Sequence, residues 1–112
     1  MLEGIRVLDL SDASGFLAGK ILGDMGADVI KLEPPTGDPG RRGPYVGDVA
    51  DPERSLPWLA MNTSKRGITL DLASDAGAEL FREIAARVDV VLETRTPGEL
   101  DARGIGWAAL RE

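Results

Sequence analysis

Acidic residues lie at the ends of two apolar, strand-length runs near the start of the chain. Asp9 and Asp12 lie at the end of the first run, residues 5–10, and Glu33 follows the second, residues 27–32. A segment with helix character separates the runs, so together they form a β-α-β unit with parallel strands. Open parallel sheets bind ligands at the carboxyl ends of their strands. We therefore predict a ligand site beside these carboxylates, and we assign none of them a catalytic role.

Glycines recur in the segment between the two runs, at Gly15, Gly19, Gly23 and Gly26. A phosphate-binding loop does not fit, because the stretch from Gly15 is one residue short of that motif and Ile21 stands where Ser or Thr would hold magnesium. We interpret the first three as small residues on one face of a helix, where they allow close approach to neighbouring backbone. Gly26 is interpreted as the residue that ends the helix.

Basic residues flank several predicted turns. Arginine can hold the phosphates of a nucleotide ligand through paired hydrogen bonds. For each of these residues, however, we favour the simpler interpretation of a loop exposed to solvent. They are Arg41, Arg42, Arg54, Lys65 and Arg66.

The composition excludes several kinds of chemistry. The 112 residues contain no cysteine and no histidine, which removes disulfides, thiolate nucleophiles and Ser-His or Cys-His catalysis. We therefore expect no metal site. A net charge of −6 argues against a nucleic-acid surface. No apolar run approaches the ~18 residues that span a bilayer, and no signal-peptide pattern follows Met1. We expect a cytoplasmic protein with neither a membrane nor a nucleic-acid partner.

Strand-length runs alternate with helical periodicity along the chain. This pattern predicts an α/β fold: a Rossmann-like open, mainly parallel sheet with flanking helices, incomplete in this chain because two full helices cannot cover both faces. Ser74 and Thr96 are predicted helix caps. Residues 34–56 are predicted to be irregular, and residues 62–67 to form a turn. The predicted strands are 5–10, 27–32, 68–72 and 89–92; the predicted helices are 14–25 and 75–87, the latter with a buried stripe of Leu80, Phe81, Ile84, Ala85 and Val88.

Five segments resemble the family III CoA-transferases in order and spacing. That superfamily includes formyl-CoA and carnitine CoA-transferases and the α-methylacyl-CoA racemases. The resemblance implies that residues 1–112 form the N-terminal part of the large CoA-binding α/β domain, with the catalytic portion absent. The matching segments are LEGIRVLDL (2–10), GADVIKLE (26–33), KRGITLDL (65–72), ARVDVVLE (86–93), and PGELD (97–101) with GIG (104–106).

The resemblance also implies an activity. A family member moves CoA between an acyl-CoA and a carboxylic acid: an aspartate attacks the thioester, and an aspartyl-CoA intermediate follows a mixed anhydride. In the racemase branch a His/Asp pair moves the α-proton instead. In the family pattern both sets of catalytic residues lie beyond residue 112, so we assign no catalytic residue to this chain. Family members form interlocked homodimers, which we expect here too.

Four residues match family positions that contact coenzyme A. Leu70 corresponds to a strand-end residue on the adenine side. Thr94 and Arg95 lie in the turn after the fourth strand, and Arg103 lies beside the Gly-x-Gly turn. Other interpretations remain open: Leu70 as a core residue, and Thr94 and Thr96 as helix caps.

Two departures from the family pattern concern the ligand. Pro34 and Pro35 stand where a basic residue often contacts the CoA nucleotide, and Arg41 or Arg42 is the candidate substitute. The segment before the first helix, residues 13–16, is also altered, and in the family it borders the acyl thioester. Substrate choice is therefore expected to differ.

Two other classes of protein stay open. Glu33 occupies the place of a ribose-binding acid, so a dinucleotide- or mononucleotide-binding module is one alternative. The chain lacks the glycine fingerprint of that fold, and we interpret Glu33 as a solvated strand terminus. The other alternative is a non-catalytic assembly protein that has lost its CoA contacts.

Overall fold

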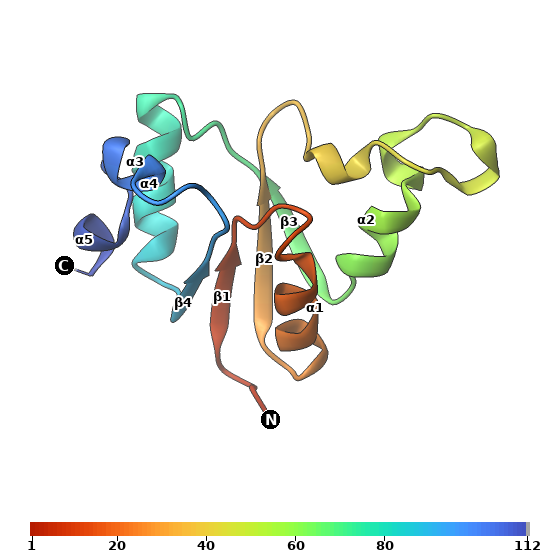
Figure 1. The fold of residues 1–112 in the computed structure, drawn as a ribbon. Coiled ribbons are helices and arrows are strands. Elements are labelled where there is room, and N and C mark those ends of the chain that lie inside the picture. Colours follow the sequence, from red (N-terminus) through yellow and green to blue (C-terminus); the bar gives the residue numbers. More distant parts are fainter. Residues whose placement is uncertain (112) are drawn as a thin grey trace.

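The computed structural model describes residues 1–111, in which four parallel strands form one open sheet (Figure 1). The spatial order is β3-β2-β1-β4. The first two strands are parallel neighbours, with Leu8 opposite Ile30. This confirms the predicted α/β fold and its β-α-β opening. The strands are β1 (Arg6–Asp9), β2 (Asp28–Glu33), β3 (Lys65–Thr69) and β4 (Val90–Leu92).

Helices lie on both faces of this sheet. α1 covers one face, mainly over β2 and β3, while α3 covers the other together with α4 and α5 (Figure 1). The segment between β2 and β3 extends away from the sheet and contains α2. The helices are α1 (Phe16–Asp24), α2 (Leu56–Met61), α3 (Asp75–Ala85), α4 (Glu99–Ala102) and α5 (Trp107–Leu110).

The main core lies between the sheet and α3. Leu8 on β1 and Phe81 on α3 are both fully buried there, as is Ile105 near the end of the chain. A smaller cluster on the α1 face contains Val7 and Val29. Alternate residues of each strand therefore serve two different layers.

The third strand begins three residues earlier than predicted. The sequence pattern gave residues 68–72 as the strand and 62–67 as a turn, whereas β3 starts at Lys65. The Leu70 amide still donates to the Glu33 carbonyl at 2.9 Å, but Leu72 has left the sheet and packs in the core. The charge of Lys65 made this residue look like part of a turn. In the structure its side chain is buried beside Asp9.

The predicted helices need smaller corrections. Ser74 caps α3 as predicted, since its side chain accepts a hydrogen bond from the Gly77 amide. Leu80 was wrongly assigned to the buried stripe and is 49% exposed, whereas Phe81 is fully buried. Thr96 is not a side-chain cap, because Gly98 adopts a left-handed φ of 89° and delays the start of α4 to Glu99.

The segment predicted to be irregular contains only single helical turns before α2. These are η1 (Pro39–Arg41), η2 (Val46–Asp48) and η3 (Pro52–Arg54). An isolated bridge between Tyr45 and Ser55 closes the segment into a loop. The absence of a periodic apolar stripe therefore predicted this region correctly.

Candidate functional site at the carboxyl edge of the sheet

A buried carboxylate lies at the centre of the carboxyl edge. Asp9, the last residue of β1, is fully buried and lies close to two lysine ammonium groups. Lys65 Nζ is 2.8 Å from Asp9 Oδ2, and Lys31 Nζ is 3.7 Å from Asp9 Oδ1. The Ser11 hydroxyl also donates to Asp9 Oδ1 at 2.6 Å. We call Asp9, Lys31 and Lys65 the central charge cluster.

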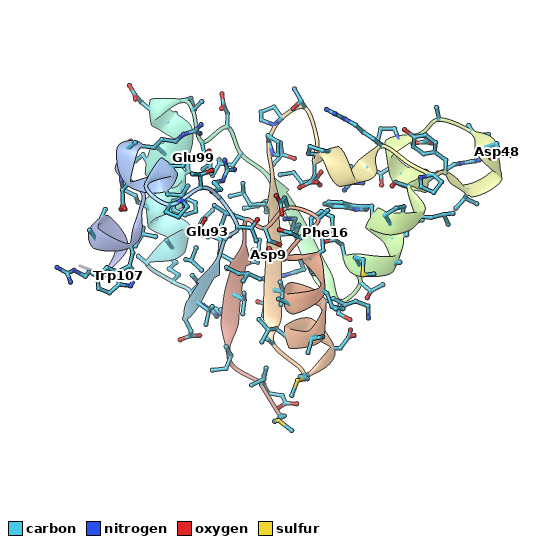
Figure 2. The ribbon with its side chains drawn as sticks, in the orientation of Figure 1. Asp9, Phe16, Asp48, Glu93, Glu99 and Trp107 are labelled. Atoms are coloured by element: carbon cyan, nitrogen blue, oxygen red, sulfur yellow. The ribbon has the colours of Figure 1, made fainter. Side chains whose placement is uncertain are left out.

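The central charge cluster is completed by the start of α1. Lys65 Nζ donates to the Phe16 carbonyl at 3.0 Å as well as to Asp9, which brings Asp9 and Phe16 close together (Figure 2). The Phe16 ring lies 5.0 Å from Lys31 Nζ and 5.6 Å from Lys65 Nζ. Burial lowers the pKa of Lys31, and the attraction of Asp9 opposes that shift. The cluster thus places two cations beside one anion beneath α1.

Glycine allows α1 to approach this cluster. A Cβ atom on Gly19 would lie 2.3 Å from Asp9 Oδ2, and one on Gly23 would lie 2.6 Å from the Ser64 carbonyl oxygen. The predicted close approach to backbone is therefore confirmed for Gly23, whereas Gly19 approaches side chains and Gly15 lies before the helix as its N-cap. Gly26 follows the helix with a φ of +105°, as expected of the residue that ends it.

Glu33 holds a second ion pair at this edge and is not a solvated strand terminus. Its side chain is 11% exposed and accepts two hydrogen bonds from Arg41, at 2.7 Å and 2.8 Å. Burial alone would raise the pKa of Glu33, but hydrogen bonds from Arg41 and the Asp38 amide outweigh it and lower that pKa. The expectation was wrong because Pro34 and Pro35 lead into a turn that returns Arg41 to the strand end.

A cleft of about 430 Å³ opens beside this pair. Its walls come from the end of β2, the turn that follows, η3 and β3. The lining residues include Glu33, Pro34, Arg41, Pro52 and Thr69.

The opposite end of the carboxyl edge carries a more exposed group of charges. Glu99 Oε1 lies 3.0 Å from Arg95 and 3.9 Å from Arg103. The side chains of these arginines are 29% and 39% exposed. The Nε atom of Arg95 is buried and has no hydrogen-bond partner among the described residues. We call Arg95, Glu99 and Arg103 the β4-side cluster.

Thr94 ties the turn after β4 to the turn after β1. Its Oγ1 accepts from the Asp12 amide at 2.9 Å and donates to Asp12 Oδ1 at 3.0 Å. Hydrogen bonds from Ser14, and secondarily from Thr94, lower the pKa of Asp12. The helix-capping interpretation of Thr94 is therefore wrong.

The structure gathers only some of the four residues assigned to coenzyme A. Thr94, Arg95 and Arg103 lie on the β4 side of the sheet. Leu70 follows β3, at the opposite edge, and packs against the main core. The two locations are separated by the two central strands of the sheet.

Several residues of the edge were missed by sequence reasoning. Asp9 was noted at a strand end, but its partners Lys31 and Lys65 were not assigned to it. Lys31 lies directly opposite Asp9 in the register of β1 and β2, so strand alignment was a signal that could have found the pair. Phe16 and Trp58 gave no comparable signal.

Residues 1–111 contain neither a group of side chains suited to a metal ion nor a membrane-spanning helix. No group of three or more Asp, Glu, His or Cys side chains in that range could hold a metal ion. Within the same range, no helix combines the length and apolar character needed to cross a membrane.

Parallel α/β sheets bind ligands at their carboxyl edge. The arginines at this edge are suited to an anionic ligand. Comparison with known proteins is more specific. Residues 2–112 match the model for CoA-transferase family III, and the chain belongs to that family.

Curated relatives cover almost the whole chain. A formyl-CoA:oxalate CoA-transferase from Streptomyces avermitilis is 42% identical over 112 residues, which is 99% of this chain and 27% of the relative. A succinyl-CoA:(R)-benzylsuccinate CoA-transferase subunit from Thauera aromatica is 40% identical over 106 residues, 94% of this chain and 26% of the relative. The chain therefore spans about a quarter of the length of these relatives.

Solved structures show the same arrangement. A CaiB/BaiF family protein from Brucella suis matches with a TM-score of 0.86 and 37% identity, covering 97% of this chain and 29% of that protein. A hypothetical protein from Mycobacterium tuberculosis gives a TM-score of 0.86 and 36% identity over 99% of this chain and 30% of its own length.

Proposed function

We propose that residues 1–112 form the N-terminal CoA-binding part of a CoA-transferase that moves CoA between an acyl-CoA and a carboxylic acid. The observation that carries this proposal is the family match over residues 2–112. The named relatives support it, because they are formyl-CoA and succinyl-CoA transferases. In the cell we expect a cytoplasmic, interlocked homodimer.

The proposed chemistry proceeds through a carboxylate outside this chain. That aspartate attacks the acyl-CoA thioester, forming a mixed anhydride and releasing CoA thiolate. The thiolate then attacks the aspartyl carbonyl, which gives an aspartyl-CoA thioester and frees the first acid. The incoming acid reverses these two steps and leaves as the new acyl-CoA. Covalent catalysis of this kind divides one acyl transfer into easier steps.

In this proposal the described residues bind and orient CoA. The side chains of Arg95 and Arg103 are 29% and 39% exposed, so both guanidinium groups can donate hydrogen bonds to phosphate. Thr94 would fix the turn that carries Arg95. Leu70 would supply apolar contact at the far edge, on the adenine side. No metal is required by this chemistry.

The test is an assay of the whole protein with succinyl-CoA or formyl-CoA and a series of carboxylic acids. Transfer of CoA, with a protein-bound CoA adduct detected by mass spectrometry, is the expected result. Exchange of the α-proton of a branched acyl-CoA in D₂O without CoA transfer would instead support the racemase alternative. Binding of NAD or ATP in preference to CoA would support a nucleotide-binding module. A protein that binds none of them would support the assembly alternative.

A further inference from the structure

We propose that Arg41 is a positioning residue, which fixes one wall of the cleft beside β2 and β3 for the nucleotide portion of CoA without contacting its phosphates. This inference rests on the function proposed above. It replaces the expectation that Arg41 itself substitutes for the basic residue absent at Pro34 and Pro35.

The Arg41 guanidinium already binds other groups of the protein. Its Nε and one terminal nitrogen donate to Glu33 at 2.7 Å and 2.8 Å, and its other terminal nitrogen donates to the Pro52 carbonyl at 3.2 Å. That terminal nitrogen also lies 3.5 Å from Glu53 Oε1. The Arg41 guanidinium is thus paired with the Glu33 carboxylate, which β2 holds in place. A phosphate would have to compete with that carboxylate for Arg41.

Aromatic contacts hold Arg41 on its other side. Its guanidinium carbon lies 3.9 Å from the centre of the Trp58 ring. Trp58 in turn meets Phe16 edge-to-face, with ring centres 5.4 Å apart. Arg41 therefore links the cleft wall to α2 and to the start of α1, which borders the central charge cluster.

The loop around Arg41 is closed by further hydrogen bonds. Ser55 is fully buried, and its hydroxyl donates to the Gly40 carbonyl at 2.8 Å while accepting from the Gly43 amide at 3.3 Å. Arg41 joins Glu33 to Pro52 across the same loop. The two ends of the segment between β2 and α2 are thus fastened to each other and to the sheet, which sets the width of the cleft.

Part of the cleft lining consists of uncharged residues. Pro34, Pro35 and Thr36 provide no charge, so their placement decides whether a nucleotide fits between them and β3. Arg42 is exposed and makes no side-chain hydrogen bond or ion pair within the described residues. Arg42 is consequently the neighbouring arginine with a free guanidinium for phosphate.

The two possible roles of Arg41 predict opposite effects of changing its partner. If Arg41 bound phosphate, Glu33→Gln would free it and tighten CoA binding. If Arg41 positions the wall, Glu33→Gln and Arg41→Gln should both weaken CoA binding, by about tenfold, as expected for loss of a charge-assisted contact. The double variant should be no weaker than either single variant, because both remove the same pair.

The experiment is calorimetric titration of the whole protein with CoA and with 3′-dephospho-CoA. Positioning predicts equal losses for both ligands, and Arg41→Lys should behave like Arg41→Gln because lysine lacks the paired donors. Arg87→Gln, just after α3, is the matched control, since Arg87 is exposed and makes no side-chain hydrogen bond or ion pair among the described residues; it should bind as the unchanged protein does. In the transferase assay, KM for the acyl-CoA should rise while kcat and KM for the acid acceptor stay constant.

Three results would overturn the inference. These are tighter CoA binding by Glu33→Gln, a loss in Arg41→Gln confined to the ligand with the 3′-phosphate, or full retention of affinity by Arg41→Lys. If the charge variants fail to fold, Trp58→Leu removes the stacking contact while leaving the ion pair, and it should give the same rise in KM; an unchanged KM would contradict the inference. If the protein without any substitution binds neither CoA nor 3′-dephospho-CoA, the proposed function itself is contradicted.

Discussion

Both ends of the carboxyl edge pair glutamate with arginine, but in different environments. Glu33 and Arg41 have side chains that are 11% and 17% exposed, whereas Glu99 and Arg95 are 36% and 29% exposed. Glu33 accepts two hydrogen bonds from its arginine, while Arg95 keeps a buried Nε without a partner. In this fold, the buried pair holds structure and the more open pair retains capacity for a ligand.

The central charge cluster is buried, as the Glu33–Arg41 pair is. Asp9 is fully buried, and the side chains of Lys31 and Lys65 are 2% and 1% exposed. Removing one member of such a group leaves uncompensated charge away from water. Stability measurements should therefore separate the buried charges from those near β4.

The largest effect is expected from Asp9→Asn. This change leaves two buried ammonium groups without their carboxylate, which should lower the free energy of unfolding by about 3–5 kcal/mol. The matched change Glu99→Gln, in the β4-side cluster, should cost less than about 1 kcal/mol. Urea denaturation of both variants measures the difference. If both variants lose the same free energy of unfolding, buried and exposed charges contribute equally to stability and the comparison is wrong.

The β4-side cluster, whose arginines are expected to matter little for stability, should matter for CoA affinity. Arg95→Ala and Arg103→Ala should each weaken CoA binding to the whole protein by about 10- to 100-fold, corresponding to charge-assisted hydrogen bonds of ~1.5–3 kcal/mol. Calorimetry with Arg87→Ala as the control measures this, because Arg87 is exposed and makes no side-chain hydrogen bond or ion pair among the described residues. Unchanged affinity in both variants would mean that the family's contacts do not transfer here, and the assembly alternative would gain.

A smaller effect is expected at Thr94. Thr94→Val removes two hydrogen bonds to Asp12 while keeping the shape of the side chain, and it should cost about 1 kcal/mol of stability. Thr63 is exposed and makes no side-chain hydrogen bond among the described residues, so Thr63→Val is the control and should be neutral within ~0.5 kcal/mol. Thermal unfolding compares the two. A neutral Thr94→Val would show that the turn does not depend on these bonds.

Acid titration should reveal how much the Glu33–Arg41 pair contributes to stability, without a substitution of Arg41. The pKa of Glu33 is lowered on folding from an ordinary value of 4.5, so its stabilising effect is present above that pH and is lost as the pH falls through the lowered pKa. The stability difference between the unchanged protein and Glu33→Gln should be constant near neutrality and shrink below pH 4.5. A difference that stays constant in acid would contradict this assignment of the pair.

The overall fold was predictable because its signals are local. Apolar runs and a glycine-spaced helix define the β-α-β opening, and Ser74 caps α3 within its own turn. The start of β3 was missed because Lys65 is charged, and the buried ion pair that it makes with Asp9 depends on a residue distant in sequence. The delayed start of α4 depends on the backbone of Gly98, which periodicity does not report.

The site was less predictable than the fold. Arginines near turns were recognised, but whether each is engaged depends on which strand ends meet in space. Glu33 and Arg41 are joined by a turn whose return path no sequence pattern specified. Trp58 gave no sign that it would stack on Arg41, because that contact requires α2 to fold back over the loop.

The strand order β3-β2-β1-β4 also implies an order of assembly. In β1, Arg6 pairs with Asp28 across one helix, whereas Val7 pairs with Val90 across most of the chain. Closing a longer loop costs more conformational entropy, and contacts distant in sequence form slowly. We expect β1, α1 and β2 to associate first, and pulse-labelled hydrogen exchange during refolding should protect amides of β2 before those of β4. Simultaneous protection would show instead that the sheet closes in one concerted step.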